Sequence, residues 1–543
     1  MKLAALLKAA TLNASKETAN RISAVGSSAV AHTPPQATVP AAGQFPDIDI
    51  QSIHYNSREV QPGGLFVAIT GFVADGHDYI HDAVERGAVA VITQKPVACR
   101  VMTFQVENTR KALSAISDLF YNHPSGRLHI TGITGTNGKT TTAYLIESML
   151  ASAGMKVGVI GTVNYRYGGN VFDNPVTTPE SLDLQRILAE MVLNGTSHVV
   201  MEVSSHAIDL FRINGCDMDV GVFTNLTQDH LDYHGSMENY WRCKKNFFTH
   251  HLAGQPLKDS VVAVVNIDNV QGKELAAAVP YPCITVGNAE ESMVKSGPVQ
   301  IDLNGIRGEL MTPDGPVTFA SQLIGSHNLE NILCATGTAV ALGLPLDVIK
   351  TGIEKTPLVP GRLEHVCHAS GKSVYVDYAH TPDALKNVLR ALKRLNPARL
   401  ICVFGCGGDR DKAKRPQMGE IAGTLCDLVI VTSDNPRTEA PGDIIDQVLT
   451  GVRRACPHEF HLSDIQKDVM HKGYWAESDR RQAIRTGIRA ARPGDIVLIA
   501  GKGHETYQLI GSRRIPFDDR IEAANALAAE RSGTARNKEM AVS

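Results

Sequence analysis

A glycine-rich segment in the first half of the chain has residue types that suit phosphate binding. The segment GITGTNGKTTTAYLIESMLASAG, residues 132–154, places Gly135 and Gly138 just before Lys139 and Thr140. Glycines permit a tight backbone that points N–H groups at phosphates, and a following helix adds its positive N-terminal end. A lysine here reaches the β- and γ-phosphates, and the threonine hydroxyl is placed to ligate Mg²⁺. The sequence therefore predicts a site for ATP or GTP.

The segment departs from the strict pattern G-x-x-x-x-G-K-[ST], because Ile133 stands where that pattern has its first glycine. A short apolar strand precedes the loop and apolar residues at helical spacing follow it, which is the context that such a motif requires. The guanine-type sequence N-K-x-D is absent, which favours ATP. The alternative for this segment is a glycine-rich turn with an exposed lysine.

The elements that must position these residues alternate between strands and helices. Apolar runs rich in β-branched residues predict two series of strands. The first comprises LHITGIT, KVGVIGTV, HVVMEV, DVGVFTNL and SVVAVVNID, and the second SVYVDYAH, RLICVFGCGGD, DLVIVTSDNPR and DIVLIAGKGHE. Strands that alternate with helices indicate an α/β fold with mostly parallel sheets, whose ligands bind at the loops after the strands.

The two series and a smaller α/β region before them predict three domains. We place them at residues 1–127, 128–360 and 361–543. The first begins with an N-terminal amphipathic helix, and residues 14–46, rich in Ala, Ser, Thr and Pro, are predicted to be a mobile insertion or linker. A second surface insertion is predicted at residues 457–477. Its His458, His461 and His471 fit no standard metal spacing.

Composition limits the classes of function. The net charge is −3, so no global basic field would recruit nucleic acid or an anionic membrane. The ten cysteines are scattered singly, which favours reduced thiols in a cytoplasm over a disulfide framework. We find no convincing targeting signal and no apolar run long enough to cross a bilayer. We expect a soluble cytoplasmic protein.

The segment GTNGKTTT resembles the phosphate loop of the Mur ligase family, which includes the folylpolyglutamate synthetases. Further segments follow in the order found in that family: SREVQPGGLFVAITG, MEVSSHAI, NLTQDHLDYHGSMENYWRCKKNFF, GSHNLENILCA, PGRLE, VDYAHTPDAL, FGCGGDRDKAKRPQMG, SDNPRTEAP and AGKGHETYQ. The resemblance covers nearly the whole chain after residue 46 and is strongest to the tripeptide-forming members. It implies a small N-terminal domain for a UDP-sugar, a central P-loop domain for ATP, and a C-terminal Rossmann-like domain for an amino acid.

The resemblance also implies a reaction. An amino acid would be joined to UDP-N-acetylmuramoyl-L-alanyl-D-glutamate in peptidoglycan precursor synthesis, with ATP as co-substrate and Mg²⁺ as cofactor, in an enzyme that we expect to be a monomer. The γ-phosphoryl group moves to the D-Glu side-chain carboxylate, and an amine attacks the acyl phosphate. Cations and backbone N–H groups must hold the crowded anions together.

Catalytic and metal-binding roles follow from matching motifs. The resemblance implies that Lys139 is catalytic and that Thr140, Glu202, His230 and Lys244 hold metal ions, with Lys244 modified to a carbamate, N6-carboxylysine. A carbamate offers two anionic oxygens to Mg²⁺, whereas an ammonium would repel the ion. The alternatives are a surface carboxylate for Glu202, a structural histidine for His230, and a solvated lysine for Lys244.

Two substrate sites are implied in the same way. The ATP site comprises Gly135, Thr136, Asn137, Gly138, Lys139, Thr140, Thr141, His327, Asn328, Asn331, Arg362, Asp377 and His380. The UDP-sugar-peptide site comprises Ser57, Arg58, Thr177, Thr178, Ser204 and Arg212. Asn56 and Leu210 depart from the family pattern, which usually has Asp and Gln there. Asn328 and Asn331 could instead be helix caps, and the two threonines could cap the helix that follows them.

The motif SDNPRTEAP indicates which amino acid is added. meso-Diaminopimelate differs from lysine by a second carboxylate, which the planar fork of Arg437 can bind bidentately. In the family, D-N-P-R accompanies diaminopimelate. The implied contacts are Arg410, Asp434, Asn435, Pro436, Arg437, Gly501 and Glu505. A surface arginine is the alternative for Arg437.

Three other functions remain open at this point. A lysine-adding homologue would share the fold and chemistry. A folylpolyglutamate synthetase has the same loop but lacks the N-terminal domain of the Ser57–Arg58 type and the D-N-P-R motif. A P-loop kinase or motor ATPase belongs to another class; a motor would need a partner surface or a basic stripe for a nucleic-acid track, and we see no such stripe.

Overall fold

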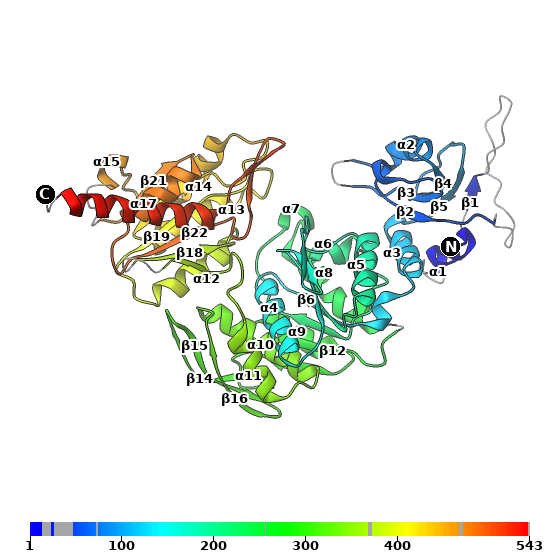
Figure 1. Cartoon of the computed structure of the whole chain (residues 1–543), viewed down its shortest axis with the longest axis horizontal. Helices are drawn as coiled ribbons and strands as arrows, with labels where there is room; N and C mark the ends of the chain where they lie inside the picture. The colour runs from blue at the N-terminus through cyan, green and yellow to red at the C-terminus, as the bar shows by residue number, and fades with distance from the viewer. Residues whose placement is uncertain are drawn as a thin grey trace.

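The computed structural model describes residues 1–12, 23–25, 47–71, 74–255, 257–367, 372–465 and 471–540 of the 543-residue chain. Figure 1 shows three α/β parts in a row, with the N-terminal part (blue) and the C-terminal part (yellow to red) on either side of a central one. The α/β class and the mostly parallel sheets are therefore confirmed. No helix within the described ranges is long and apolar enough to cross a membrane.

The N-terminal part is built on a five-stranded sheet in the order β1-β5-β4-β3-β2. Its strands are β1 (Ser23–Val25), β2 (Ser52–His54), β3 (Gly64–Val67), β4 (Ala88–Thr93) and β5 (Met102–Gln105). Its helices are α1 (Leu3–Leu12), α2 (Ile80–Glu85) and α3 (Thr109–Phe120), with short 3₁₀ turns η1 (Ser57–Glu59) and η2 (Gly76–Tyr79). β2 to β5 run parallel, whereas β1 is antiparallel to β5.

Two predictions fall in this part. The N-terminal helix is confirmed as α1, which buries Leu3, Leu6 and Leu7 completely. Within the segment 14–46, the linker prediction is wrong for residues 23–25, because these residues form β1 and extend the sheet by one edge strand. The rest of that segment lies outside the described residues.

The central part holds an eight-stranded sheet in the order β13-β12-β11-β6-β10-β7-β8-β9, in which all pairings are parallel except those of β8 with β7 and β9. The strands are β6 (His129–Thr134), β7 (Val157–Ile160), β8 (Tyr165–Tyr167), β9 (Asn170–Phe172), β10 (His198–Glu202), β11 (Val220–Phe223), β12 (Val262–Asn266) and β13 (Cys283–Val286). The helices are α4 (Lys139–Ser152), α5 (Ser181–Leu193), α6 (Ser205–Asp209), α7 (Leu231–His234), α8 (Met237–Asn246), α9 (Val270–Ala278), α10 (Ser326–Ala341) and α11 (Leu346–Lys355). The 3₁₀ turns η3 (Pro124–Arg127) and η5 (Leu252–Gly254) and the π-helix η4 (Phe247–His251) complete it.

Sequence patterns did not reveal a small antiparallel sheet in this part. It consists of β14 (Lys295–Asp302), β15 (Gly305–Thr312) and β16 (Gly315–Ser321). It contributes Ile306, Leu310, Val317 and Phe319 to the same core as the main sheet.

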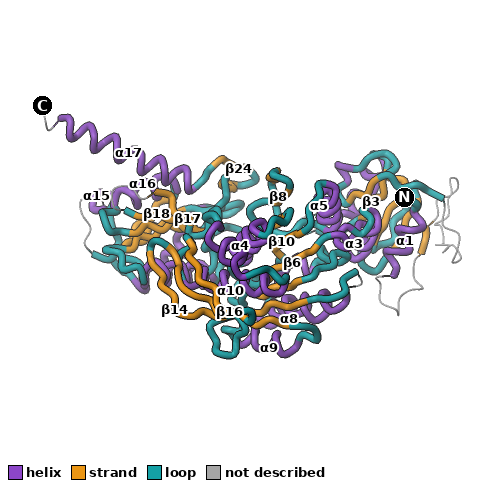
Figure 2. The backbone as a smooth tube through the Cα atoms, turned by 60° about the horizontal axis from the view of Figure 1, so that its bottom comes forward, coloured by secondary structure: helices purple, strands orange, loops and turns teal. Residues whose placement is uncertain are grey.

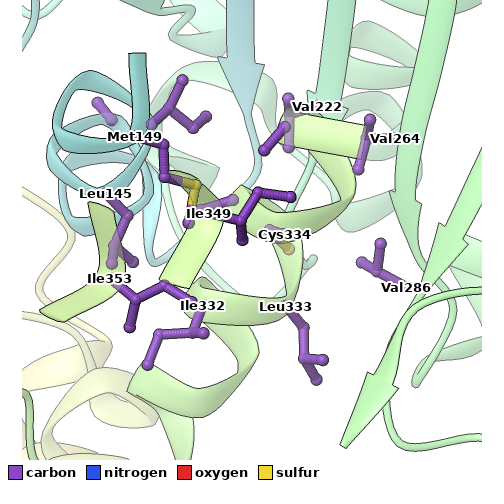
Figure 3. Packing of buried hydrophobic residues seen from close by; sticks show 14 of the residues in the cluster. Leu145, Met149, Val222, Val264, Val286, Ile332, Leu333, Cys334, Ile349 and Ile353 are labelled. Carbon is purple, nitrogen blue, oxygen red and sulfur yellow. The ribbon is translucent and has the colours of Figure 1, made fainter. Parts of the chain in front are cut away.

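Packing of three helices on the main sheet fixes the nucleotide-binding helix. Figure 3 shows Leu145 and Met149 of α4 beside Ile349 and Ile353 of α11. All four of these side chains are buried, as are the valines of β11, β12 and β13 beneath α10. Helix α4 therefore cannot shift without opening the core, and its first residue, Lys139, is held in place.

The C-terminal part holds a six-stranded sheet in the order β17-β18-β22-β19-β20-β21, parallel except for β17. The strands are β17 (Glu364–Cys367), β18 (Ser373–Asp377), β19 (Leu400–Phe404), β20 (Leu428–Thr432), β21 (Gly473–Glu477) and β22 (Ile496–Ala500), and β23 (Tyr507–Ile510) and β24 (Arg513–Pro516) form a hairpin. The helices are α12 (Pro382–Lys393), α13 (Lys414–Leu425), α14 (Pro441–Ala455), α15 (Leu462–Ile465), α16 (Arg480–Ala490) and α17 (Asp519–Met540). Figure 2 shows α17 extending away from the body of the molecule.

The predicted surface insertion at residues 457–477 is wrong for the end of the segment, Gly473–Glu477. Its end forms β21, which pairs in parallel with β20 as an edge strand of the main sheet. Phe460 and Tyr474 are buried, so part of the segment belongs to the core. Residues 466–470 lie outside the described residues.

Candidate active site

A cavity of about 430 Å³ lies where loops of the central and C-terminal parts meet. The loops that follow the parallel strands β6, β10, β11 and β18 all contribute to its wall. All of the predicted nucleotide and metal residues line it: Gly135, Thr136, Asn137, Gly138, Lys139, Thr140, Thr141, Glu202, His230, Lys244, His327, Asn328, Asn331, Arg362, Asp377 and His380. Residues more than 200 positions apart are thereby brought to one site.

The glycine loop has the geometry that its sequence predicts. Gly135 and Gly138 have φ values of +142° and +86°, which side chains rarely adopt. A Cβ atom at Gly135 would collide with Thr224, and one at Gly138 with Asn331. The Nζ atom of Lys139 donates to the carbonyl oxygens of Gly135 (3.0 Å) and Thr136 (2.8 Å). These contacts keep the lysine folded over the loop whose N–H groups would receive phosphates.

The side-chain oxygens of Glu202 and Thr140 lie next to each other in the cavity wall and could both ligate a metal ion. The Thr140 hydroxyl donates to Glu202 Oε2 (3.1 Å), and Thr162 donates to both carboxylate oxygens, at 2.9 Å each. Glu202 is only 1% exposed, so the alternative of a surface carboxylate is wrong. A buried carboxylate beside a hydroxyl suits Mg²⁺, which prefers oxygen ligands. Across the described ranges no three His, Cys, Asp or Glu side chains gather as a metal site.

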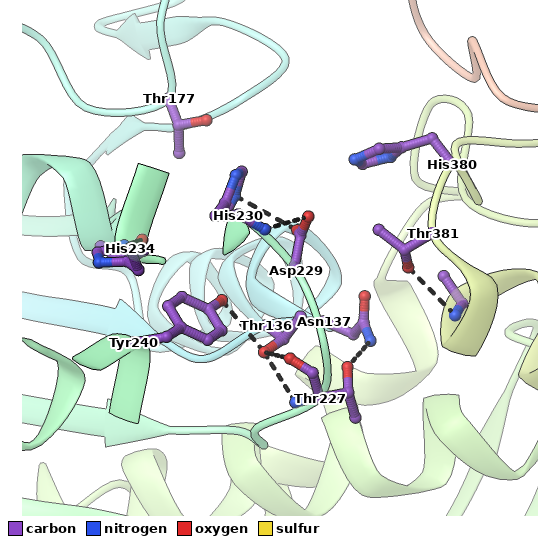
Figure 4. A network of polar contacts seen from close by, with 12 residues as sticks. Thr136, Asn137, Thr177, Thr227, Asp229, His230, His234, Tyr240, His380 and Thr381 are labelled. Carbon is purple, nitrogen blue, oxygen red and sulfur yellow. Dashed lines mark hydrogen bonds and ion pairs between the residues drawn. The ribbon is translucent and has the colours of Figure 1, made fainter. Parts of the chain in front are cut away.

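His230 lies on another side of the cavity, where α7 begins. Its Nε2 atom lies 3.3 Å from the Asp229 carboxylate, and Figure 4 shows the two side chains facing each other, a contact that orients the ring. Burial lowers the pKa of His230 to about 4, even though the charge of Asp229 opposes the shift. The imidazole is therefore neutral at neutral pH, which is the state that binds a metal ion.

Lys244 is buried beneath the glycine loop. Its Nζ atom donates to the carbonyl oxygen of Gly135 (2.8 Å) and lies 4.7 Å from the ring centre of Tyr240. The hydroxyls of Tyr240 and Thr136 are 3.2 Å apart (Figure 4). Burial, with the charge of Lys139, holds the pKa of Lys244 well below its usual range. At 1% exposure, Lys244 is not the solvated lysine of the alternative interpretation.

Helix α10 supplies the predicted base-binding side of the cavity. Asn331 donates its Nδ2 to Asn328 Oδ1 (2.9 Å), and Asn328 donates to the carbonyl oxygen of Ile324 (2.8 Å). The N-cap of α10 is Gly325, so the helix-cap alternative for the two asparagines is wrong. The Nδ1 atom of His327 is buried without a hydrogen-bond partner. A nucleotide base could satisfy it.

The C-terminal part closes the cavity from the other side. The guanidinium of Arg362 donates to the Thr140 hydroxyl (3.1 Å) and lies 4.6 Å from the ring centre of Tyr378. The carboxylate of Asp377 accepts the backbone N–H groups of Leu363 (2.6 Å) and Ala379 (2.8 Å). It therefore shapes the two segments that carry Arg362 and His380, rather than standing free.

The predicted UDP-sugar residues are divided between two places. Thr178 joins the group in the central part, since its hydroxyl donates to the Glu202 carbonyl (2.8 Å) and accepts the Ser204 N–H (3.1 Å). Arg212 donates to the Thr178 carbonyl (3.1 Å). The N-cap of α5 is Glu180, so the alternative of threonine caps is wrong. Thr177 and Ser204 also line the cavity.

Ser57 and Arg58 lie in η1 of the N-terminal part and do not line the cavity. Asn56, which departs from the family pattern, caps this turn by accepting the Arg58 N–H (3.2 Å). The second departure, Leu210, is the C-cap of α6. The predicted UDP-sugar residues of the N-terminal part, Ser57 and Arg58, therefore do not line the same cavity as those of the central part.

The predicted amino-acid residues gather at the carboxyl ends of three neighbouring strands, β22, β19 and β20. Asn435 donates its Nδ2 to Glu505 Oε2 (2.8 Å), and Arg437 donates to the Gly408 carbonyl (2.7 Å). A Cβ atom on Gly501 would lie 2.5 Å from the carboxylate of Asp434. Burial, then the charge of Arg410, lowers the pKa of Arg437. The two other predicted amino-acid contacts are Pro436, which is buried, and Arg410, which is exposed.

Sequence reasoning missed several polar residues of both sites. Lys502 is completely buried and donates to Asn435 (3.1 Å) and Glu505 (2.7 Å). Helix α12 and the residue after it present a polar stripe to the cavity: Asp383, Asn387, Arg390 and Arg394. The spacing of three or four residues between these polar side chains could have predicted that they share one face of a helix. Thr162 and Asp229 gave no comparable signal.

Comparison with known protein families places three consecutive matches along the chain. Residues 49–121 match "Mur ligase family, catalytic domain", residues 133–339 match "Mur ligase middle domain", and residues 361–503 match "Mur ligase, glutamate ligase domain". The three matches fall in the N-terminal, central and C-terminal parts described above, in that order.

Individual relatives are similar over most of their length. The UDP-N-acetylmuramoyl-L-alanyl-D-glutamate–2,6-diaminopimelate ligase of Geobacter metallireducens is 48% identical over 89% of this chain and 95% of its own. The protein of the same name from Geobacter sulfurreducens is 46% identical over 89% and 96%. A solved structure of a UDP-N-acetylmuramoyl-L-alanyl-D-glutamate–2,6-diaminopimelate ligase aligns with a TM-score of 0.63 and 31% identity, covering 91% of this chain and 98% of that one.

Proposed function

The chain belongs to the Mur ligase family of ATP-dependent amide ligases, and we propose that it adds meso-diaminopimelate to UDP-N-acetylmuramoyl-L-alanyl-D-glutamate in peptidoglycan precursor synthesis. The observation that carries the choice of amino acid is the grouping of Asp434, Asn435, Arg437 and Glu505. Acidic and basic side chains together suit an amino acid with charges at both ends. The ligase names of the relatives support the same choice.

ATP would bind with its phosphates on the glycine loop and its base beside α10. Backbone N–H groups, the start of α4 and Lys139 would balance the phosphate charge. Arg362, which contacts Thr140, brings a cation from the C-terminal part to the same place. Residues of both the central and the C-terminal part would therefore bind the nucleotide.

In the first chemical step, an oxygen of the D-Glu side-chain carboxylate attacks the γ-phosphorus of ATP. The bond from that phosphorus to the bridging oxygen breaks, and ADP leaves. In the second step, the amine of diaminopimelate attacks the acyl carbon, phosphate leaves, and the nitrogen loses a proton. Crowded anions are the main barrier, so Lys139 and Arg362 act chiefly by stabilising charge.

The residues present fit Mg²⁺. Thr140 and Glu202 would hold one ion, and His230 with a carbamate on Lys244 would hold a second. When bound, Mg²⁺ neutralises phosphate charge as it develops. The carbamate forms when the neutral Lys244 amine bonds to the carbon of CO₂ and releases a proton. The buried place of that amine, against the Gly135 carbonyl, supports this modification.

The amino acid would lie with its ammonium group near Glu505 and Asp434, and with its distal carboxylate near Arg437. Asn435 and Lys502 fix Glu505 by bonds of 2.8 and 2.7 Å. Lysine would leave Arg437 without an anionic partner in a half-buried place, which is unfavourable. We further infer a cytoplasmic monomer, where UDP-linked precursors and ATP are both available.

The test is a phosphate-release assay with a panel of amino acids. ATP, Mg²⁺ and the UDP-linked dipeptide are held constant while meso-diaminopimelate, lysine and other amino acids are supplied in turn. Release should need the dipeptide and rise strongly only with meso-diaminopimelate. Release with folate or nucleic acid in place of the dipeptide would contradict the proposal.

A further inference from the structure

A completely buried ion pair lies behind the amino-acid-binding loops. Arg480 begins α16 and Asp519 begins α17, and both side chains are 0% exposed. The Nε and Nη2 atoms of Arg480 donate to the two carboxylate oxygens of Asp519, at 2.7 Å each. This bidentate geometry fixes the plane of the guanidinium.

The remaining N–H groups of Arg480 reach two loops at once. Its Nη1 atom donates to the carbonyl oxygen of Ser433 (3.3 Å), and Nη2 donates to that of Ala500 (3.0 Å). Ser433 precedes Asp434, and Ala500 precedes Gly501. Arg480 therefore holds the last residue before each of the two loops that carry most of the proposed amino-acid contacts.

The start of α17 is tied to the second loop by other bonds as well. The Phe517 N–H donates to the Thr506 carbonyl (2.9 Å), and Arg520 approaches the His504 carbonyl at 3.5 Å. Asp519 thus lies on an element that is fastened to the loop that it stabilises through Arg480.

A buried ion pair is weak evidence for stability by itself, because apolar residues often replace one without loss. An apolar pair could not reproduce the hydrogen bonds from Arg480 to the carbonyl oxygens of Ser433 and Ala500. We propose that Arg480, held by Asp519, is a positioning residue that sets the spacing of the two amino-acid-binding loops and so contributes to selection of diaminopimelate over lysine. This inference rests on the proposed function, since it assigns the loops to that substrate.

The same two helices provide a matched control. Arg481, the next residue of α16, pairs with Glu522 of α17 at 2.8 Å, but its side chain is 47% exposed and its hydrogen bonds go to Glu522 and not to the carbonyl groups that Arg480 contacts. Arg481→Ala removes an ion pair between the same helices without touching the spacing of the loops. It should leave each KM and the amino-acid preference unchanged.

The experiment compares Arg480→Lys, Asp519→Asn and the double variant Arg480→Met/Asp519→Leu with wild type and the control. For each, KM is measured for meso-diaminopimelate, ATP and the UDP-linked dipeptide, together with the diaminopimelate-to-lysine ratio of kcat/KM and the Tm. An ammonium cannot make all four contacts of the guanidinium. We expect Arg480→Lys to raise the KM for diaminopimelate by roughly ten- to hundredfold, because small misplacements of binding groups are costly.

The KM values for ATP and the dipeptide should not change, and the selectivity ratio should fall. The double variant should regain the wild-type Tm while keeping the raised KM. A wild-type KM and ratio in Arg480→Lys, or full recovery of both in the double variant, would overturn the inference and leave the proposed function intact. A wild-type enzyme that adds no amino acid would overturn both.

Discussion

The Nζ atom of Lys244 lies 2.8 Å from the carbonyl oxygen of Gly135, so a buried amine on α8 contacts the phosphate-binding loop at the end of β6. The two residues are 109 positions apart. A carbamate on this amine would lie beside the glycine loop, as we propose above. Burial at this place favours the uncharged lysine amine over an ammonium, and bound Mg²⁺ would have to compensate the charge of the anionic product.

The first prediction concerns that lysine. Lys244→Ala should lower kcat by at least about 100-fold, since it removes a group that organises charge around the transferred phosphoryl. Acetate or bicarbonate in the buffer should restore part of the activity, because a small carboxylate can occupy the vacated space. Phosphate release with and without acetate measures both effects.

Lys245→Ala is the control for this variant. Lys245 is adjacent in sequence but pairs with Glu274 at the surface, at 2.7 Å. Its replacement should leave kcat unchanged. Near-normal activity in Lys244→Ala would disprove a role for Lys244 in the reaction.

The second prediction concerns the choice of amino acid. Arg437→Ala should raise the KM for meso-diaminopimelate by about 10- to 100-fold, because hydrogen bonds to a charged group contribute about 1.5–3 kcal/mol. The KM for lysine should change little. Arg454→Ala, on the exposed side of α14, serves as the control. An unchanged preference in Arg437→Ala, or efficient lysine addition by the wild type, would show that another group selects the substrate.

The third prediction concerns pH and Glu330, whose carboxyl lines the nucleotide cavity. Burial, then the charges of Asp268 and Asp383, raises the pKa of Glu330 from 4.5 to about 7. Between these values the folded protein keeps a proton that the unfolded chain has released. The free energy of unfolding therefore falls as pH rises through this window, and the loss is complete above the folded-state pKa.

Glu330→Gln is neutral at every pH and escapes this loss. Urea denaturation at about pH 8 should show the variant more stable than wild type by about 1 kcal/mol, after allowance for screening by water in the open cavity. Near pH 4 the two should be equal. Glu354→Gln, an exposed residue of α11, is the control. A difference between Glu330→Gln and wild type that does not depend on pH would contradict the assignment.

The fourth prediction concerns residues 14–46. Replacing them by a short glycine–serine linker removes β1 but keeps Ser57, Arg58 and the parallel strands of the sheet. We expect kcat within about threefold of wild type, because changes in loop length have small thermodynamic effects, and a Tm lowered by a few degrees through loss of an edge strand. Loss of cooperative unfolding in this variant would show that the segment is part of the core.

Local motifs made the strands and the glycine loop predictable from sequence. The residues that form the glycine loop are contiguous in sequence. The motif requires glycine at positions 135 and 138, and both residues have the positive φ that glycine readily adopts. Strand β21 was not recognised, because Gly473–Glu477 follows a polar segment that resembles an insertion. Its place in the sheet depends on β20, which lies about 40 residues earlier in the chain.

Buried charges were the least predictable feature. Lys502 contacts Asn435 across 67 positions, and Arg480 contacts Asp519 across 39. In the sequence, each of these residues is indistinguishable from a solvated surface charge. Only the fold shows that each of these charges is buried and paired. Arg437 could be predicted because it belongs to the D-N-P-R motif, whereas Lys502 and Arg480 belong to no motif that we recognised.

The proposed acyl phosphate reaction is tested most directly by following oxygen from the substrate into phosphate. The D-Glu side-chain carboxylate of the UDP-linked dipeptide is labelled with ¹⁸O, and product and released phosphate are analysed by mass spectrometry. We expect one UDP-linked tripeptide containing diaminopimelate per phosphate, with one ¹⁸O atom in each phosphate released. Unlabelled phosphate, or phosphate released while the dipeptide stays unchanged, would contradict the proposed reaction.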